Sequence, residues 1–214
     1  MSAESLTGQR ISPPVPVPVP PEWWRPIAAR PGPATLLGCA GLAVAVGVRV
    51  AVAGADGARS PGAGLVFAVL LIGLALALGV PRGRLRIGDV VKGLIGAAVL
   101  CLGPLITHSG IGSHTAAAGF ASWAAVVVVV AAAEEVLLRG ALFGVVTRWR
   151  GEDAAVLVTA IAFALLHVPV YGWHVLPLDL AVGAGLGALR LWSGGVTAPA
   201  VAHIGADLAG WWLR

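Results

Sequence analysis

The chain has 214 residues, of which 58% are hydrophobic and 11% are charged, and its net charge is +4. Soluble globular chains contain about 45–50% apolar and about 25% charged residues, and a soluble domain of this size could not bury so much apolar surface. The basic residues are scattered and form no stripe with interleaved aromatic residues, which argues against a nucleic-acid partner. The composition therefore excludes a soluble domain and predicts an integral membrane protein.

The first element along the chain is a proline-rich segment, residues 1–33. Its proline run, Pro13 to Pro21, predicts an extended polyproline-type conformation. Trp23 and Trp24 follow the run, and amphipathic tryptophan rings favour the headgroup region of a membrane. We expect this segment to be cytosolic and to lead the chain to the membrane.

Apolar runs bounded by glycine, proline or charge make up the rest of the chain. They lie at about 34–54, 62–80, 90–107, 116–147, 154–171, 175–192 and 195–213. A membrane-spanning helix needs about 20 residues. We therefore predict an all-α, polytopic transmembrane helix bundle of about seven spans, in one membrane domain. The run at 116–147 is too long for one perpendicular crossing, so it must tilt, kink or extend beyond the membrane.

The positions of arginine and lysine predict the orientation of the bundle. On a seven-span path, one side receives Arg10, Arg25, Arg30, Arg82, Arg84, Arg86, Lys92, Arg148, Arg150 and Arg190. The other side receives Arg59 and Arg214. Because cytosolic loops of membrane proteins collect positive charge, we expect a cytosolic N-terminus, an external C-terminus and a location in the plasma membrane of a prokaryote. Arg49 lies within the first span, where it either snorkels to the interface or pairs with a carboxylate.

Charged residues inside the fourth apolar run indicate function. Glu134, Glu135 and Arg139 follow a wholly apolar stretch, although a charge near the bilayer centre costs at least about 2.5–3.5 kcal/mol. Glu135 and Arg139 share one helical face, so a buried ion pair that fixes helix packing is one interpretation. Glu134 points about 100° away around the helix. Its partner must therefore come from another helix.

Two later apolar runs supply candidate partners for Glu134. His167 lies in the fifth run, and His203 and Asp207 share one face of the seventh. A rise of 1.5 Å per residue places Glu134 and His167 at about 21 Å from the cytosolic helix ends, Asp207 at about 18 Å and His203 at about 12 Å. We therefore expect these four side chains to meet in one layer of the bundle.

Glycine pairs at small-xxx-small spacing favour the close helix packing that such a layer needs. Gly140 and Gly144 form one pair in the fourth run, and Gly183 and Gly187 form another in the sixth.

Polar residues near the outer ends of the spans have a simpler interpretation. For Asp179 and His174, at the outer end of the sixth run, interfacial solvation is favoured over catalysis. His108 and His114 flank a glycine-rich outer loop in which no partner is evident.

The ordered motifs on these runs resemble those of the CPBP family, also called Abi. That family comprises the CAAX prenyl endopeptidases of type 2 and their bacterial relatives. The motifs are E-E-x-x-x-R, F-x-x-x-H and H-x-x-x-D, carried here by Glu134, Glu135, Arg139, Phe163, His167, His203 and Asp207. The resemblance covers about residues 116–213, which would be the catalytic membrane core, and leaves 34–115 as N-terminal transmembrane helices. It implies an intramembrane protease that cleaves apolar, membrane-associated or lipidated proteins.

The resemblance also implies roles for individual residues. Glu134 would act as the general base on a water that His167 also holds, and Arg139 would hold Glu135 and shape the site. His203 and Asp207 would stabilise the oxyanion or position the water.

At the last motif position this chain departs from the family that it resembles, in which that residue is often asparagine. Asp207 can donate a hydrogen bond to an oxyanion only when it is protonated. Members of the family are commonly described as metalloproteases, and His167, His203 and Asp207 would form a possible zinc site with a fourth position for water. A metal-free glutamate mechanism is equally compatible with the residues.

Two other functions remain open at this level. A non-catalytic membrane scaffold or immunity protein of the same family could keep the motif residues as a packing network. A proton-coupled transporter could use intramembrane glutamate and histidine as a relay, although the chain shows no evident internal repeat. In each case the expected surroundings are membrane lipid, with a peptide substrate for the protease and no nucleic acid. The oligomeric state is left open.

Overall fold

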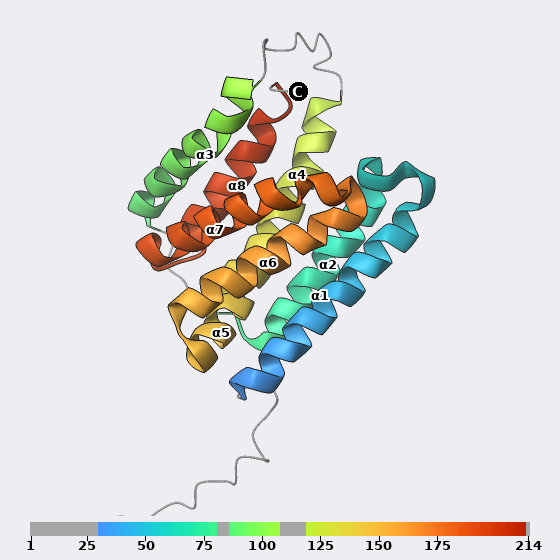
Figure 1. Cartoon of the computed structure of the whole chain (residues 1–214). Helices are drawn as coiled ribbons and strands as arrows, with labels where there is room; N and C mark the ends of the chain where they lie inside the picture. The colour runs from blue at the N-terminus through green and yellow to red at the C-terminus, as the bar shows by residue number, and fades with distance from the viewer. Residues whose placement is uncertain (1–29, 81–85, 108–118, 213–214) are drawn as a thin grey trace, which may run out of the picture.

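The computed structural model describes residues 30–80, 86–107 and 119–212, and within these ranges the chain is helical with no strand. Figure 1 shows the helices packed side by side in one bundle. The predicted all-α fold is thus confirmed. The predictions for the proline-rich segment, for Trp23 and Trp24, and for His108 and His114 concern residues outside the described ranges.

The described helices coincide closely with the predicted apolar runs. In chain order they are α1 (Pro31–Ala53), η3 (Gly54–Arg59), α2 (Pro61–Leu78), α3 (Ile87–Thr107), α4 (Phe120–Glu135), η4 (Val136–Leu142), α5 (Phe143–Arg150), α6 (Glu152–Tyr171), η5 (Trp173–Val175), α7 (Leu176–Ser193) and α8 (Thr197–Ala209). The short elements η3 and η5 are 3-10 helices, and η4 is a π-helix.

Five helical segments of the described chain are long and apolar enough to cross a membrane. They are Pro31–Ala53, Pro61–Leu78, Phe120–Arg150, Glu152–Tyr171 and Trp173–Ser193. Helix α8 has 13 residues, which extend about 20 Å, whereas a hydrocarbon core is about 30 Å thick. The predicted number of about seven spans is therefore approximate, and α8 reaches through only part of a membrane.

Local sequence accounts for several helix boundaries. The Ser60 hydroxyl accepts a hydrogen bond from the Ala63 amide and caps the start of α2. Gly151, with a φ of 88°, lies between α5 and α6, where the chain must reverse. An L side chain is disfavoured in that conformation, so glycine permits this tight connection.

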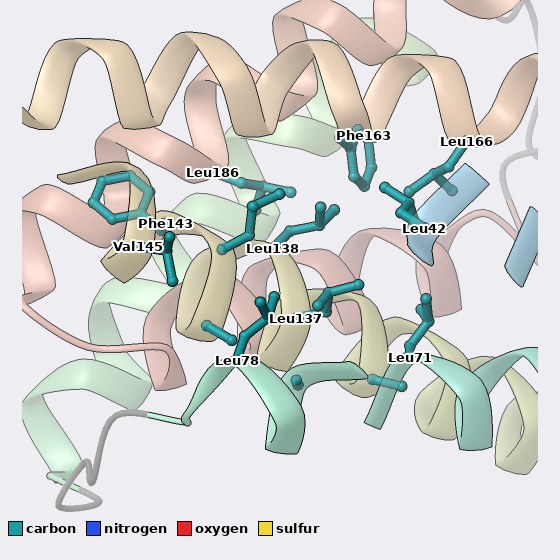
Figure 2. Packing of buried hydrophobic residues seen from close by; sticks show 14 of the residues in the cluster. Leu42, Leu71, Leu78, Leu137, Leu138, Phe143, Val145, Phe163, Leu166 and Leu186 are labelled. Atoms are coloured by element: carbon teal, nitrogen blue, oxygen red, sulfur yellow. The ribbon is translucent and has the colours of Figure 1, made fainter. Parts of the chain in front are cut away.

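The hydrophobic core lies where α1 and α2 pack against the α4–η4–α5 segment, with α6 and α7 on the far side. Figure 2 labels ten of its members, Leu42, Leu71, Leu78, Leu137, Leu138, Phe143, Val145, Phe163, Leu166 and Leu186. Many apolar side chains instead point out of the bundle, including Leu36, Val44, Val69, Leu76, Leu94, Val99 and Leu165. A surface so apolar belongs in lipid, and the protein is an integral membrane protein.

Candidate active site

A buried ion pair anchors the site at the junction of α4 and η4. Arg139 Nη1 donates to Glu135 Oε1 at 2.8 Å, and both side chains have an exposed fraction of 0%. Arg139 Nη2 donates to the carbonyl oxygen of Gly183 on α7 at 3.0 Å. The i,i+4 pairing expected from the sequence is present, and it also ties η4 to α7.

His203 of α8 connects this pair to the remaining carboxylates. Its Nδ1 donates to Glu135 Oε1 at 3.0 Å. Its Nε2 lies 3.9 Å from Glu134 Oε2 and 3.5 Å from Asp207 Oδ2. One imidazole therefore contacts three acidic side chains. This contact agrees with the expectation that the two side chains meet in one layer of the bundle, although a uniform rise per residue placed His203 nearer to the cytosolic helix ends.

Glu134 lies in the wall of a cavity of about 740 Å³. The polar part of the wall also contains His167 of α6, Asp179 of α7 and Asp207 of α8. The apolar part comes mainly from one face of α4, with Val126, Val127, Val130 and Ala131. Acid and imidazole groups from four helices thus share one chamber beside the buried Glu135–Arg139 pair.

His167 is held by its own helix and by α7. Its Nδ1 lies 3.0 Å from the Phe163 carbonyl oxygen and 3.6 Å from Asp179 Oδ2. Both neighbours of Nδ1 are oxygen acceptors, so this nitrogen carries the proton and donates, while Nε2 keeps a lone pair. The Phe163 ring packs edge-on against His167 and His203, at centroid distances of 4.7 and 5.2 Å. Phe163 therefore sets the spacing of the two imidazoles.

Arg49 is a site residue whose role the sequence left undecided. Its Nη1 lies 3.9 Å from Glu134 Oε1, its side chain is 12% exposed, and its guanidinium stacks over Phe67 of α2. Of the two open alternatives, pairing with a carboxylate is the one that the structure contains. The sequence signal was a charge inside an apolar span, but its partner depends on how α1 packs against α4.

Asp179 is a second residue that sequence reasoning set aside. Interfacial solvation was the favoured interpretation, yet its carboxylate lies in the cavity wall beside His167 with the side chain 18% exposed. The packing of α7 against α6 brings Asp179 and His167 together. No sequence motif near either residue predicts this contact.

The predicted glycine contacts of the sixth span hold helices α6 and α7 close together. A Cβ added to Gly183 would lie 2.9 Å from the Ala160 Cα, and one added to Gly187 would lie 3.0 Å from a Val156 methyl carbon. The same approach places the Gly183 carbonyl within reach of Arg139.

The predicted zinc ligands do not assemble into a metal centre. No group of three histidine, cysteine or acidic side chains in the described part of the chain is arranged to hold a metal ion. His203 directs Nδ1 to Glu135, and His167 directs Nδ1 to a backbone carbonyl. The described residues, as they are arranged, do not fit a three-ligand site. A zinc requirement therefore stays a prediction from the sequence.

Comparison with known families agrees with the motif resemblance. Residues 116–209 match the family model described as Type II CAAX prenyl endopeptidase Rce1-like. No curated protein and no solved structure matches the chain. The matched stretch contains Glu134, Glu135, His167, His203 and Asp207, whereas Arg49 lies before it.

Proposed function

We propose that this chain, whose residues 116–209 match the family model described as Type II CAAX prenyl endopeptidase Rce1-like, cleaves peptide bonds in the membrane with water activated by Glu134. Intramembrane protease activity is what the family implies. One observation supports the choice of base. Glu134 is 2% exposed and lies in the cavity wall, whereas its neighbour Glu135 is 0% exposed and accepts hydrogen bonds from Arg139 and His203.

The different surroundings of Glu134 and Glu135 support different roles. A general base must come within hydrogen-bond reach of the water whose proton it takes. Glu134 meets this requirement through the cavity, and the side chains of Arg49 and His203 lie 3.9 Å from its carboxylate oxygens. Glu135 Oε1 already accepts hydrogen bonds from Arg139 and His203. We therefore assign Glu135 to positioning His203, and Glu134 to the chemistry.

The proposed reaction proceeds through a tetrahedral intermediate. Glu134 takes a proton from water while the His167 Nε2 lone pair orients that water, and the water oxygen attacks the scissile carbonyl carbon. A proton on His203 Nε2 stabilises the oxyanion that forms. Glu134 then returns its proton to the leaving nitrogen as the carbon–nitrogen bond breaks. Asp207, 3.5 Å from His203 Nε2, orients the imidazole in this scheme, which suits a carboxylate where relatives often have asparagine.

The cavity wall supports an apolar peptide as the substrate. Val126, Val127 and Val130 line one side, and Trp123 and Trp211 lie at its outer part. These surfaces would bury aliphatic side chains next to the polar groups at the far end of the chamber. We propose an apolar, membrane-associated or lipidated protein substrate.

The proposal is tested with the purified full chain in detergent. A panel of lipidated and transmembrane peptides is incubated with the wild type, Glu134→Ala, His167→Ala and the control Glu152→Gln, which alters an exposed acid at the start of α6. Cleavage by the wild type and the control, with none by the two site variants in folded form, supports the mechanism. Cleavage by folded Glu134→Ala at the wild-type rate removes the proposed base.

A strong chelator added to the same assay tests the zinc prediction separately. Loss of cleavage that zinc restores would support a metalloenzyme. Unchanged cleavage would support the metal-free glutamate mechanism.

A non-catalytic scaffold is the second candidate, and the buried Glu135–Arg139–His203 network favours it. This network links α4, η4, α7 and α8 through hydrogen bonds of 2.8 to 3.0 Å, as expected of residues that hold helices together. A cellular phenotype that depends on the protein and survives both Glu134→Ala and His167→Ala would support the scaffold over the protease.

A further inference from the structure

The bundle has two ends that differ in chemistry. We call one the cavity end, where α4 begins and α8 ends, because Ser60, Ser122, Tyr171 and Trp211 line the cavity there. The Phe120 ring contacts the Trp211 ring at 5.6 Å, which places the start of α4 beside the end of α8. Figure 1 shows these helix ends on the same side as η3.

We call the opposite end the basic end. Its described basic residues are Arg30, Arg86, Lys92, Arg148, Arg150 and Arg190. The Trp149 ring packs against Gly32, so the end of α5 lies beside the start of α1. Lys92 Nζ donates to the Trp192 carbonyl oxygen, so the start of α3 lies beside the end of α7. By contrast, η3 at the cavity end contributes Arg59, and the 108–118 connection, which joins α3 to α4, has no arginine or lysine in its sequence.

Positive charge collects on the cytosolic side of membrane proteins, and here it collects at the end that lies away from the cavity. The geometry points to an active site that opens to the extracytoplasmic side of the membrane. If the proposed function holds, the substrate is then an extracytoplasmic peptide segment of an exported or membrane-anchored protein. A cytosolic prenylated C-terminus would meet the closed end of the bundle.

The depth of Glu134 agrees with this orientation. Helix α4 and its continuation run from the cavity end to Arg148 at the basic end, and 14 residues separate Glu134 from Arg148. At 1.5 Å per residue this is about 21 Å, in a hydrocarbon core about 30 Å thick. This length exceeds half of the hydrocarbon core, as expected for a site nearer to the outer side.

Packing closes the route that runs along η4 and α5 from the basic end. Leu138, Leu142, Val145 and Val146 follow Glu134 toward that end, and each has an exposed fraction of 1% or less. A peptide from the cytosol would have to displace these side chains and the buried Arg139. A peptide from the cavity end meets an existing opening.

The acidic side chains of the cavity restrict which residues a substrate can carry near the scissile bond. Glu134, Asp179 and Asp207 line it, against the one guanidinium of Arg49. A substrate carboxylate brought beside these acids would be repelled in a partly desolvated chamber. We expect the cleaved segment to be apolar and free of acidic residues next to the scissile bond.

Cysteine accessibility in cells tests the orientation without relying on activity. Cys39 and Cys101 are free and are first replaced by alanine. Ser122→Cys then places a thiol in the cavity wall, and Glu152→Cys places a matched exposed thiol at the basic end. A membrane-impermeant maleimide should label Ser122→Cys in intact bacterial cells and label Glu152→Cys only in inverted vesicles. The reverse pattern would overturn the inference.

Reporter proteins that carry the cleavage segment on one chosen side of the membrane test the substrate class. Two single-span reporters carry the same apolar, non-acidic cleavage segment, one on the extracytoplasmic and one on the cytosolic side of the span. Glu134-dependent cleavage of the first reporter is expected, and cleavage of the second alone would overturn the substrate assignment. Extracytoplasmic labelling of Ser122→Cys together with no cleavage of any peptide by the purified wild type would reject the proposed function and leave the orientation standing.

Discussion

Glu134 and Glu135 are chemically identical neighbours whose environments predict opposite consequences of mutation. We expect Glu134→Gln to abolish cleavage while the protein stays folded, because the Glu134 carboxylate lies in the cavity wall, with the side chains of Arg49 and His203 each 3.9 Å away. We expect Glu135→Gln to lower stability by about 3–5 kcal/mol, the usual cost of leaving a buried charge such as Arg139 without its partner. Cleavage rate and thermal unfolding in detergent, measured on both variants, check this contrast.

The result that would contradict this assignment is an exchange of the two phenotypes. A folded, inactive Glu135→Gln beside an active Glu134→Gln would transfer the role of base to Glu135. The near-isosteric amide keeps the side-chain volume the same in both variants, so the comparison isolates charge.

We expect Arg49 to contribute to catalysis although it lies outside the family-matched stretch. Its guanidinium lies 3.9 Å from Glu134 Oε1 and is largely buried, so it helps to fix the carboxylate that activates water. We expect Arg49→Gln to lower kcat about tenfold, equivalent to about 1.4 kcal/mol, with a smaller change in KM. Arg49→Lys should recover part of the loss because it restores the positive charge.

The control for Arg49 is Arg150→Gln, which removes an exposed arginine at the basic end. That variant should retain the wild-type kcat. An Arg49→Gln protein with wild-type kcat would show that this ion pair does not act on Glu134.

Sequence reasoning was strong for residues whose partners lie on the same helix and weak for the others. The Glu135–Arg139 pair follows from helical periodicity, since residues four apart share a face. The contacts of Arg49 with Glu134 and of Asp179 with His167 depend on how separate helices approach each other. No periodicity within one helix encodes that approach.

At the level of elements, hydrophobic runs located the helices because a backbone in lipid must satisfy its own hydrogen bonds. The predicted runs at 154–171 and 175–192 differ by only a few residues from α6 and α7. The π-helix η4 was not predicted, because a change in backbone hydrogen-bond register leaves the apolar pattern intact. It begins directly after Glu135 and contains Arg139, a placement typical of π-helical turns at functional sites.

The α6–α7 contact gives a prediction at this scale. We expect Gly183→Ala to destabilise the protein by about 1–3 kcal/mol, because its new Cβ would lie 2.9 Å from the Ala160 Cα. It should also lower activity, since the Gly183 carbonyl accepts from Arg139. Thermal unfolding and cleavage rate measured on the same preparation check both effects.

Gly185→Ala is the matched control on the same helix. A Cβ at Gly185 has no atom within 4 Å, so this variant should unfold at or slightly above the wild-type temperature. Equal unfolding temperatures for the two alanine variants would show that the α6–α7 approach is not close-packed.

At the scale of the whole molecule, composition and arginine placement predicted the membrane class and an orientation, but neither could locate the cavity. A cavity is the space that remains after all helices have packed. Here α1, α2, α4, α6, α7 and α8 each contribute to its wall. The helices that precede the family-matched stretch are therefore part of the site.

The matched stretch is accordingly expected to depend on the rest of the chain. Leu71 and Leu78 of α2 are buried in the same core as Leu137 and Leu142, and separating them would expose apolar surface shaped for protein contact. We expect a fragment of residues 116–214 to be aggregated and inactive. Co-expression with residues 1–115 should restore a folded complex and cleavage, because membrane helices can assemble after independent insertion. Size-exclusion profiles and cleavage rates of the fragment, the pair and the full chain check this, and an active fragment alone would show that Arg49 and α2 are dispensable.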